Sequence, residues 1–107
     1  MRRAIDFATV IRTGSRARSG RVLVHHVAEL TPDSPALVGL VVGKPVGGSV
    51  ARHAVSRKLR AQLALRLDRL PQGSGTVVRA LPGAETATSG QLADDLESAF
   101  TRLVGRA

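Results

Sequence analysis

Apolar and polar residues at the start of the chain recur with the helical period. Asp6 can cap a short helix that runs to about Arg12 and stops at Gly14. The residues predicted on its inner side are Phe7, Val10 and Ile11. This segment therefore predicts a short amphipathic helix that would pack on the rest of the protein.

A longer helical pattern occupies the middle of the chain. Its apolar residues recur every four positions, at Ala51, Val55, Leu59, Leu63 and Leu67. Ser49 is a plausible N-cap, and the helix is predicted to end near Leu70, before Pro71. A third helix is predicted from the capping-box pair Thr88 and Gln91 to about Val104. The residues that it would bury are Leu92, Leu96, Ala99, Phe100 and Leu103.

Segments with strand character separate these helices. Residues 21–28 (RVLVHHVA) and 37–42 predict two strands joined by the turn sequence TPDSP, and residues 76–81 predict another after PQGSG. A shorter strand can form near residues 16–18. The order helix, two or three strands, helix, strand, helix predicts an α+β sandwich, with one sheet and helices packed on it. At 107 residues the chain, 1–107, is expected to form a single domain.

Positive charge is concentrated in the first part of the sequence. The formal net charge is +8, and residues 1–60 hold eleven Lys or Arg, among them Arg2 and Arg3, against three acidic residues. The rest of the chain holds five of each kind. This segregation favours a polyanionic partner, with nucleic acid as the leading candidate, that the first half contacts.

Several classes of protein are disfavoured by what the sequence lacks. There is no cysteine, which excludes disulfides and thiolate chemistry, and no apolar run approaches the roughly 20 residues of a membrane span. The start of the chain has no secretory signal pattern, so the cytoplasm is the expected location.

One face of the predicted central helix is polar and basic. Successive helical residues turn by about 100°, which separates this face from the apolar stripe. The glycine-rich loop GKPVGG precedes it and leads into a helix N-terminus, where free backbone N–H groups favour phosphate. A solvated basic face and a simple turn are the alternatives, and the Gly-Lys-Ser/Thr of a Walker loop is missing. The residues predicted to bind RNA are Lys44, Gly47, Ser49, Arg52, His53, Ser56, Arg57 and Arg60.

This loop and helix, GLVVGKPVGGSVARHAVSRKLR at 39–60, resemble the signature of the bacterial ribonuclease P protein family. The family pattern is Gly-x-x-Val-x-Lys-Lys-Val-Gly followed by Ala-Val-x-Arg-Asn-Arg-x-Lys-Arg-x-x-Arg. The matching residues are Lys44, Val46, Gly47, Val50, Arg52, Arg57 and Arg60. Asp6, Phe7, Val10 and Gly14 fit the family's Asp-Phe-x-x-Val-x-x-x-Gly opening, and VVRALPGA resembles its fourth strand and the following turn. The resemblance covers nearly the whole chain.

The sequence departs from this signature at four positions. Pro45 stands where a second Lys is usual, His53 where Asn is usual, and Ala54 and Ser56 where basic residues are usual. Lys58 can replace one charge, from another angle of the helix. Because each lost phosphate contact removes roughly one released counterion, we expect weaker RNA binding than is usual in the family.

The resemblance implies a fold and separate roles for the protein and the RNA. The fold would be one mixed four-stranded sheet with three helices and a left-handed β-α-β crossover. The loop and central helix would contact the catalytic ribonuclease P RNA, and a cleft between the first helix and the sheet would bind the 5′ leader of precursor tRNA. The RNA would perform the hydrolysis with Mg²⁺ held mainly by RNA and substrate. The protein would be an accessory subunit, monomeric before assembly, with no catalytic residue and no metal site of its own.

The positions of the leader cleft in this family correspond here to Phe7, Ile11, Val22 and His25, with Arg12 as a neighbouring cation. Only Phe7 is aromatic, so the cleft would depend more on shape, backbone contacts and cations than on base stacking. Strand alternation places Val22 and His25 on opposite faces unless a bulge intervenes. For Phe7, a core position is the alternative.

Three other functions compete with this interpretation. In a nuclease that acts alone, His25 or His53 would serve as general base, but no His or Asp spacing resembles a metal site. A small basic ribosomal protein would share the length, charge and mixed α/β character. Binding to a membrane surface is disfavoured because the apolar face of the central helix lacks Trp and Phe.

Overall fold

The computed structural model describes residues 5–105, which form three α-helices and a four-stranded sheet. The helices are α1 (Phe7–Thr13), α2 (Ser49–Ala64) and α3 (Ser89–Val104). The strands are β1 (Ser15–Ser19), β2 (Val22–Val27), β3 (Leu37–Val41) and β4 (Gly75–Ala80). Short 3₁₀ turns follow β3 at Lys44–Val46, α2 at Leu67–Arg69 and β4 at Ala84–Thr86. The predicted order of elements is confirmed, and β1 is longer than the strand expected at 16–18. Arg2 and Arg3 lie outside the described residues.

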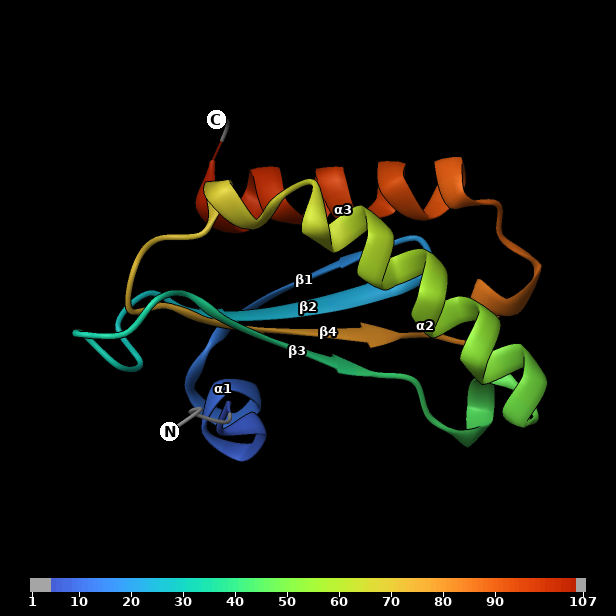
Figure 1. Ribbon diagram of the computed structural model, residues 1–107, viewed down its shortest axis with the longest axis horizontal. Helices are drawn as coiled ribbons and strands as arrows, with labels where there is room; N and C mark the ends of the chain where they lie inside the picture. The colour runs from blue at the N-terminus through green and yellow to red at the C-terminus, as the bar shows by residue number, and fades with distance from the viewer. Residues whose placement is uncertain (1–4, 106–107) are drawn as a thin grey trace.

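The sheet is mixed, with the strand order β1-β2-β4-β3 (Figure 1). The β1–β2 and β2–β4 pairs are antiparallel, whereas β3 and β4 are parallel. The β3–α2–β4 connection is the unit for which the family resemblance implies a left-handed crossover. Because β3 pairs only with β4, one of its edges is free within the described part of the chain.

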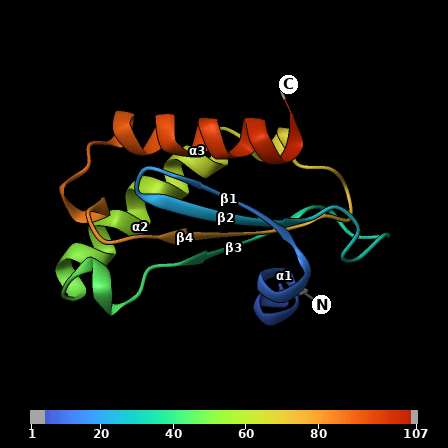
Figure 2. The same cartoon turned by 180° about the vertical axis from the view of Figure 1, so that it is seen from behind.

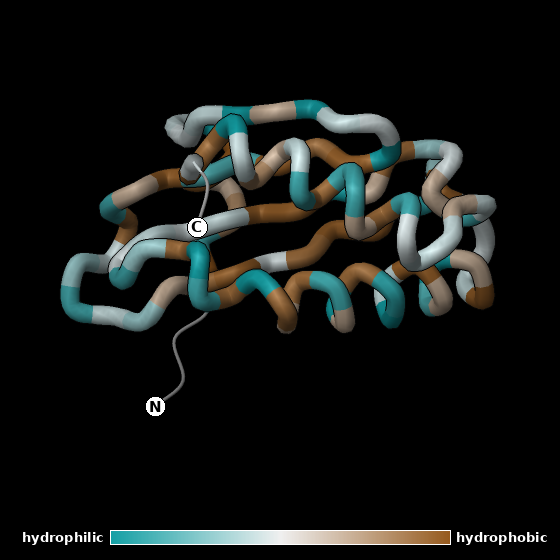
Figure 3. The backbone as a smooth tube through the Cα atoms, turned by 90° about the horizontal axis from the view of Figure 1, so that it is seen from above, coloured by the Kyte–Doolittle hydropathy of each residue, from teal (hydrophilic) through white to brown (hydrophobic). Residues whose placement is uncertain are grey.

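Two helices cover one face of the sheet and the first helix covers part of the other. Figures 1 and 2 show α3 above the strands, α2 running obliquely from the level of α3 down past one end of the sheet, and α1 below the strands. The core lies under α2 and α3, and its largest fully buried side chains include Phe100, Leu59, Leu92 and Leu96. In Figure 3 hydrophobic colours concentrate along the central strands, whereas the helices alternate between the two colours, as amphipathic elements should. The predicted α+β sandwich is confirmed.

Helix α2 ends at Ala64, six residues before the predicted end at Leu70. A spacing of four residues drifts by about 40° at each step, so Leu67 would lie about 160° around the helix from Ala51 and could not share its buried face. The chain leaves the helix, and Arg66 donates a hydrogen bond of 2.8 Å to the carbonyl of Gln62 in the last turn. Leu67 is 47% exposed, and Leu70 returns to the core.

Two of the three predicted N-caps are confirmed. The carboxylate of Asp6 accepts hydrogen bonds from the backbone and the hydroxyl of Thr9, at 3.1 and 2.7 Å. Thr88 and Gln91 form the complete capping box of α3. The prediction for Ser49 is wrong, because Ser49 is already the first helical residue and Gly48 is the N-cap, with no side-chain hydrogen bond. The extended backbone of Gly48 starts the helix without help from a side chain.

Candidate nucleic-acid interface

Helix α2 presents the polar and basic face that its sequence predicts. Val55, Leu59 and Leu63 are buried against the sheet and α3. On the other side, His53, Arg57 and Arg60 are exposed, and Arg52 and Ser56 are half-buried. A shallow hollow on this side is lined by Ser49, Val50, His53, Ala54 and Arg57. The helix therefore offers cations around a small apolar surface at its first two turns.

The glycine-rich loop is anchored to the protein by one apolar residue. Val46 is buried, while Lys44 and Pro45 are exposed in the 3₁₀ turn. Gly47 has φ of 148°, which side chains rarely allow, and a Cβ there would lie 3.0 Å from the Cβ of Ala51. Gly47 is thus required for the sharp entry into α2, whose first N–H groups have no partner within the helix. Lys44 and these N–H groups share one end of the molecule.

Two cations near this face differ in their availability. Lys58 donates a hydrogen bond of 3.1 Å to the carbonyl of Ala87, so it fastens α2 to the segment before α3, and its replacement of a lost charge of the signature stays a prediction. The Nε atom of Arg52 is buried and has no hydrogen-bond partner among the described residues. A buried donor without a partner is costly, so Arg52 has an unmet requirement for an acceptor.

The opposite face of the sheet carries a second group of cations. By the strand register, Arg16 and His25 share one cross-strand row with Val77 and Gly39, and Arg18 and Leu23 share the next row with Arg79 and Val41. Helix α1 packs on β2 and β4 and covers only part of this face. Arg16, Arg18 and Arg79 are exposed beyond it. The sequence had not indicated Arg16 and Arg79 as site residues, because only the register brings them together.

His25 lies between these cations. The side chain is 4% exposed, and its Nδ1 atom has no hydrogen-bond partner among the described residues. Burial lowers the pKa of His25, and the guanidinium groups of Arg79 and Arg16 lower it further. The lowered pKa favours the neutral imidazole, whose buried Nδ1 atom has no partner among the described residues, on a positively charged face.

Val22 does not belong to this face. It pairs with Ser19 and Ala80 in an unbroken register and is fully buried in the core on the α2–α3 side. Its assignment to the leader cleft is therefore wrong: strand alternation separates it from His25, as the sequence already suggested. Ile11 is half-buried on α1, and Arg12 is exposed in the last turn of that helix.

A groove along the free edge of β3 is lined by residues of both predicted sites: Phe7 of the leader cleft and Arg60 of the RNA-binding face. The ring of Phe7 lies over Gly39, where a Cβ atom would come within 2.5 Å of the ring, so only glycine permits this approach. Phe7 is 38% exposed and so belongs to the surface as well as to the packing of α1. The groove has a volume of about 520 Å³, and Arg60 of α2 also lines it. Its other lining residues are Ile5, Val38, Gly39, Leu40, Leu63, Ala64 and Leu67.

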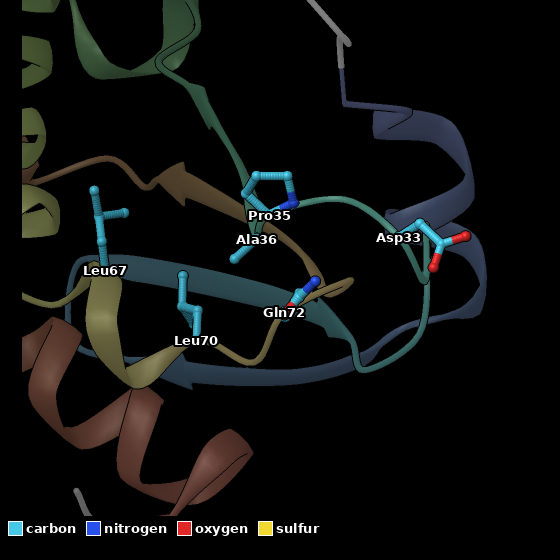
Figure 4. Close-up of a pocket in the computed structure, with 6 residues that line it drawn as sticks. All are labelled: Asp33, Pro35, Ala36, Leu67, Leu70 and Gln72. Atoms are coloured by element: carbon cyan, nitrogen blue, oxygen red, sulfur yellow. The ribbon is translucent and has the colours of Figure 1, made fainter.

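A larger hollow lies at the other end of β3, between the β2–β3 loop and the turn after α2 (Figure 4). Its volume is about 720 Å³, and its lining includes Leu67 and Leu70. Its one charged lining residue is Asp33, which repels phosphate. This hollow is therefore not part of the candidate interface.

The cations of the candidate interface are not neutralised within the protein. The ion pairs found in residues 5–105 all use acids of α3: Asp95 binds Arg21, and Glu97 binds Arg66 and Arg69. None of them involves Arg57, Arg60 or Arg79. Within residues 5–105 the acids of α3 thus pair with Arg21, Arg66 and Arg69, and the cations of α2, the loop and the sheet face are left outside these pairs.

The described residues hold no cluster of side chains that typically bind a metal ion. No group of three His, Cys, Asp or Glu side chains comes together anywhere in residues 5–105. His53 is exposed on α2, whereas His25 lies on the sheet, so the two histidines considered as general bases are on different surfaces. In the same part of the chain, no helix has the length and apolar character needed to cross a membrane.

The family model for ribonuclease P matches residues 1–104. A ribonuclease P protein component from Streptomyces griseus is 48% identical to this chain over 114 aligned residues, with 98% of this chain and 91% of the relative covered. One from a Mycobacterium species is 42% identical, with coverage of 95% and 86%. These similarities extend over the loop, α2 and the sheet alike.

Solved structures share the fold. The RNase P protein of Staphylococcus aureus superposes with a TM-score of 0.80 at 20% identity, covering 99% of this chain and 96% of the other. The RNase P protein of Thermotoga maritima gives a TM-score of 0.75 at 18% identity, with coverage of 99% and 98%.

Proposed function

Since this chain belongs to the ribonuclease P protein family, we propose that it is the protein subunit of a ribonuclease P ribonucleoprotein that binds both the catalytic RNA and the 5′ leader of precursor tRNA. In this role it assists the removal of the leader during tRNA 5′ maturation. The observation that carries the proposal is that Phe7 and Arg60 line one groove, beside a basic helix that forms no ion pair within residues 5–105.

The basic helix suits a folded RNA. Arg57 and Arg60 extend from α2 into solvent, and Lys44 and the α2 N-terminus lie at the same end. Cations and free N–H groups in this arrangement bind backbone phosphates without reading sequence. The half-buried Arg52 adds a further guanidinium to this face.

The groove suits a single strand. Its walls are aliphatic, Phe7 supplies one ring for base stacking, and Arg60 supplies a phosphate partner. The groove follows the free edge of β3, so it is elongated and is not a closed pocket. An unpaired leader fits this shape better than a duplex does.

The chemistry is assigned to the RNA. No three His, Cys, Asp or Glu side chains come together within residues 5–105, and in this proposal RNA and substrate hold the Mg²⁺. The protein's contribution is to neutralise phosphate charge and to hold the leader. We further propose that the protein is monomeric before assembly and acts in the cytoplasm.

The test is cleavage of precursor tRNA at low Mg²⁺ by the cognate catalytic RNA, with and without this protein, beside the protein alone. Stimulation that requires the RNA supports the proposal. Absence of stimulation would favour a ribosomal or other RNA-binding role, and cleavage by the protein alone would overturn both.

The basic face can be tested by the salt dependence of binding to the catalytic RNA. Arg57→Ala and Arg52→Ala should each weaken binding and reduce the slope of log K against log salt by about 1. Arg66→Ala is the matched control, because this guanidinium is engaged by Glu97 and Gln62 and lies away from the face. A slope unchanged by Arg57→Ala would contradict the assignment.

A further inference from the structure

A separate pocket lies at the carboxyl ends of the two parallel strands. It has a volume of about 310 Å³ and shares no lining residue with the groove at the β3 edge. Its lining residues are Val41, Gly43, Pro45, Arg79, Ala80, Leu81 and Pro82. Figure 1 shows the β3–α2 loop and the segment after β4 at this same end of the sheet.

The chemistry of the pocket is a set of apolar walls with one cation. Val41, Leu81 and the two prolines are aliphatic, and no acid lines the pocket. Arg79 is exposed, belongs to none of the ion pairs found in residues 5–105, and contributes the only charge among the lining residues. A nucleotide matches this combination. Its flat base can pack on the proline rings and on the guanidinium plane, and its phosphate can bind the arginine.

The position of the pocket connects it to the groove. Val41 and Arg79 are register partners, and the neighbouring row holds Gly39, over which Phe7 lies. Gly39 and Val41 are two residues apart, about 7 Å along the strand. A single strand that occupies the groove at Phe7 therefore reaches the pocket within a few nucleotides. Arg16, Arg18 and His25 lie on the same sheet face, whereas the basic face of α2 does not.

We propose that this pocket receives one unpaired nucleotide of the 5′ leader, with its base against Pro45 and Pro82 and its phosphate on Arg79. The inference rests on the proposed function and deepens it. Pro45 is one of the positions where this chain departs from the family signature: the usual lysine is replaced by an apolar wall. A contact through a base thus takes the place of a contact through charge.

The pocket can be filled without disturbing the backbone. Gly43 has an extended conformation, with φ of −92° and ψ of 179°, and a Cβ there would meet only the Cδ of Pro45, at 3.5 Å. Gly43→Leu should therefore fold and place its side chain in the pocket. Gly90→Leu is the matched control: it adds the same side chain to the exposed first turn of α3, where a Cβ has its nearest neighbour at 3.9 Å.

The experiment measures the affinity of the assembled holoenzyme for mature tRNA and for precursors whose leaders grow by one nucleotide at a time. Gly43→Leu should lose about tenfold in affinity once the leader is long enough to reach the pocket, and nothing for mature tRNA. Gly90→Leu should match the wild type throughout. Arg79→Gln should weaken the same long-leader precursors and reduce the salt slope by about 1.

A scan with abasic leader nucleotides provides a test that needs no protein variant. An abasic nucleotide at one leader position should weaken binding to the wild-type protein by about tenfold. The same abasic nucleotide should not weaken binding to Gly43→Leu any further, because the two changes remove the same contact. If no single position matters, the pocket holds no leader base. If Gly43→Leu lowers the affinity for the catalytic RNA, the pocket serves that RNA instead, and the inference is wrong. Failure of the proposed function would appear differently, as a wild-type protein that neither stimulates cleavage nor responds to leader length.

Discussion

At the scale of single residues, the environment of His25 is the clearest electrostatic feature of the sheet face. Its ring is buried between strands whose neighbouring side chains are Arg16 and Arg79, and it has an open Nδ1 atom. Burial and these two cations all disfavour the imidazolium, and the pKa of His25 is lowered. A neutral imidazole adds no charge to the face.

Arg79→Gln should raise the pKa of His25 toward its ordinary value, because one of the cations that repel the imidazolium is removed. An NMR titration of the histidine ring would measure this shift. Arg18→Gln is the control, since Arg18 lies in the same cross-strand row as Arg79 but is not among the causes of the lowered pKa. A pKa that responds equally to both changes, or to neither, would refute this account.

At the scale of elements, the two long helices begin in different ways. Helix α3 begins with a reciprocal pair, in which the Thr88 hydroxyl accepts from the N–H of Gln91, and the Gln91 side chain accepts from the N–H of Thr88. Helix α2 begins at Gly48 with no side-chain cap, after the sharp turn at Gly47. The start of α2 therefore keeps free N–H groups, which are the groups that a phosphate would use.

Thr88→Ala should lower the free energy of unfolding by about 1 kcal/mol, whereas Ser49→Ala should leave it nearly unchanged. Thr88 satisfies a backbone donor of α3, whereas Ser49 is an exposed first residue of α2. Urea unfolding followed by circular dichroism would compare the two variants under identical conditions. Equal losses would mean that Ser49 also acts as a cap, contrary to the structure.

At the scale of the whole molecule, stability depends on histidines buried in the sheet. The Nδ1 atom of His26 lies 2.9 Å from the hydroxyl of Thr76 on the core side, and burial lowers the pKa of His26. Burial, followed by the nearby arginines, lowers the pKa of His25 as well. Asp6 titrates at lower pH, and its pKa is lowered chiefly by the hydrogen bond from the Thr9 side chain.

The free energy of unfolding should fall in two steps as the pH decreases. Below the ordinary histidine pKa of about 6.5 the unfolded chain binds protons that the folded protein refuses, so stability is lost from that pH down to the folded-state values. A second loss follows as Asp6 is protonated below its ordinary value of about 3.9. Urea unfolding between pH 7.5 and about 3 would reveal both steps, and His26→Gln should make the first one smaller. A stability that is constant from pH 7.5 to 5 would disprove the role of the histidines.

Features that depend on neighbours along the chain could be predicted without coordinates. The Asp6 cap, the capping box at Thr88 and the two faces of α2 each involve residues three or four positions apart, whose geometry the helix itself imposes. The charge surplus of the first half and the resemblance to the ribonuclease P protein family were also visible in the sequence. These observations led to the basic helix and its loop.

The tertiary structure decided which distant residues share a surface. Strand register places Arg79 on the same sheet face as His25, in the neighbouring row, and assigns Val22 to the core, and the packing of α1 brings Phe7 into the groove that Arg60 also lines. Such contacts depend on how strands pair and on which face of the sheet each helix covers, and many pairings satisfy the same pattern of alternating residues. The sequence by itself therefore determined the elements, their polar faces and the family, while the groove, the pocket beside Pro45 and the unpaired cations around them arose only when these elements packed together.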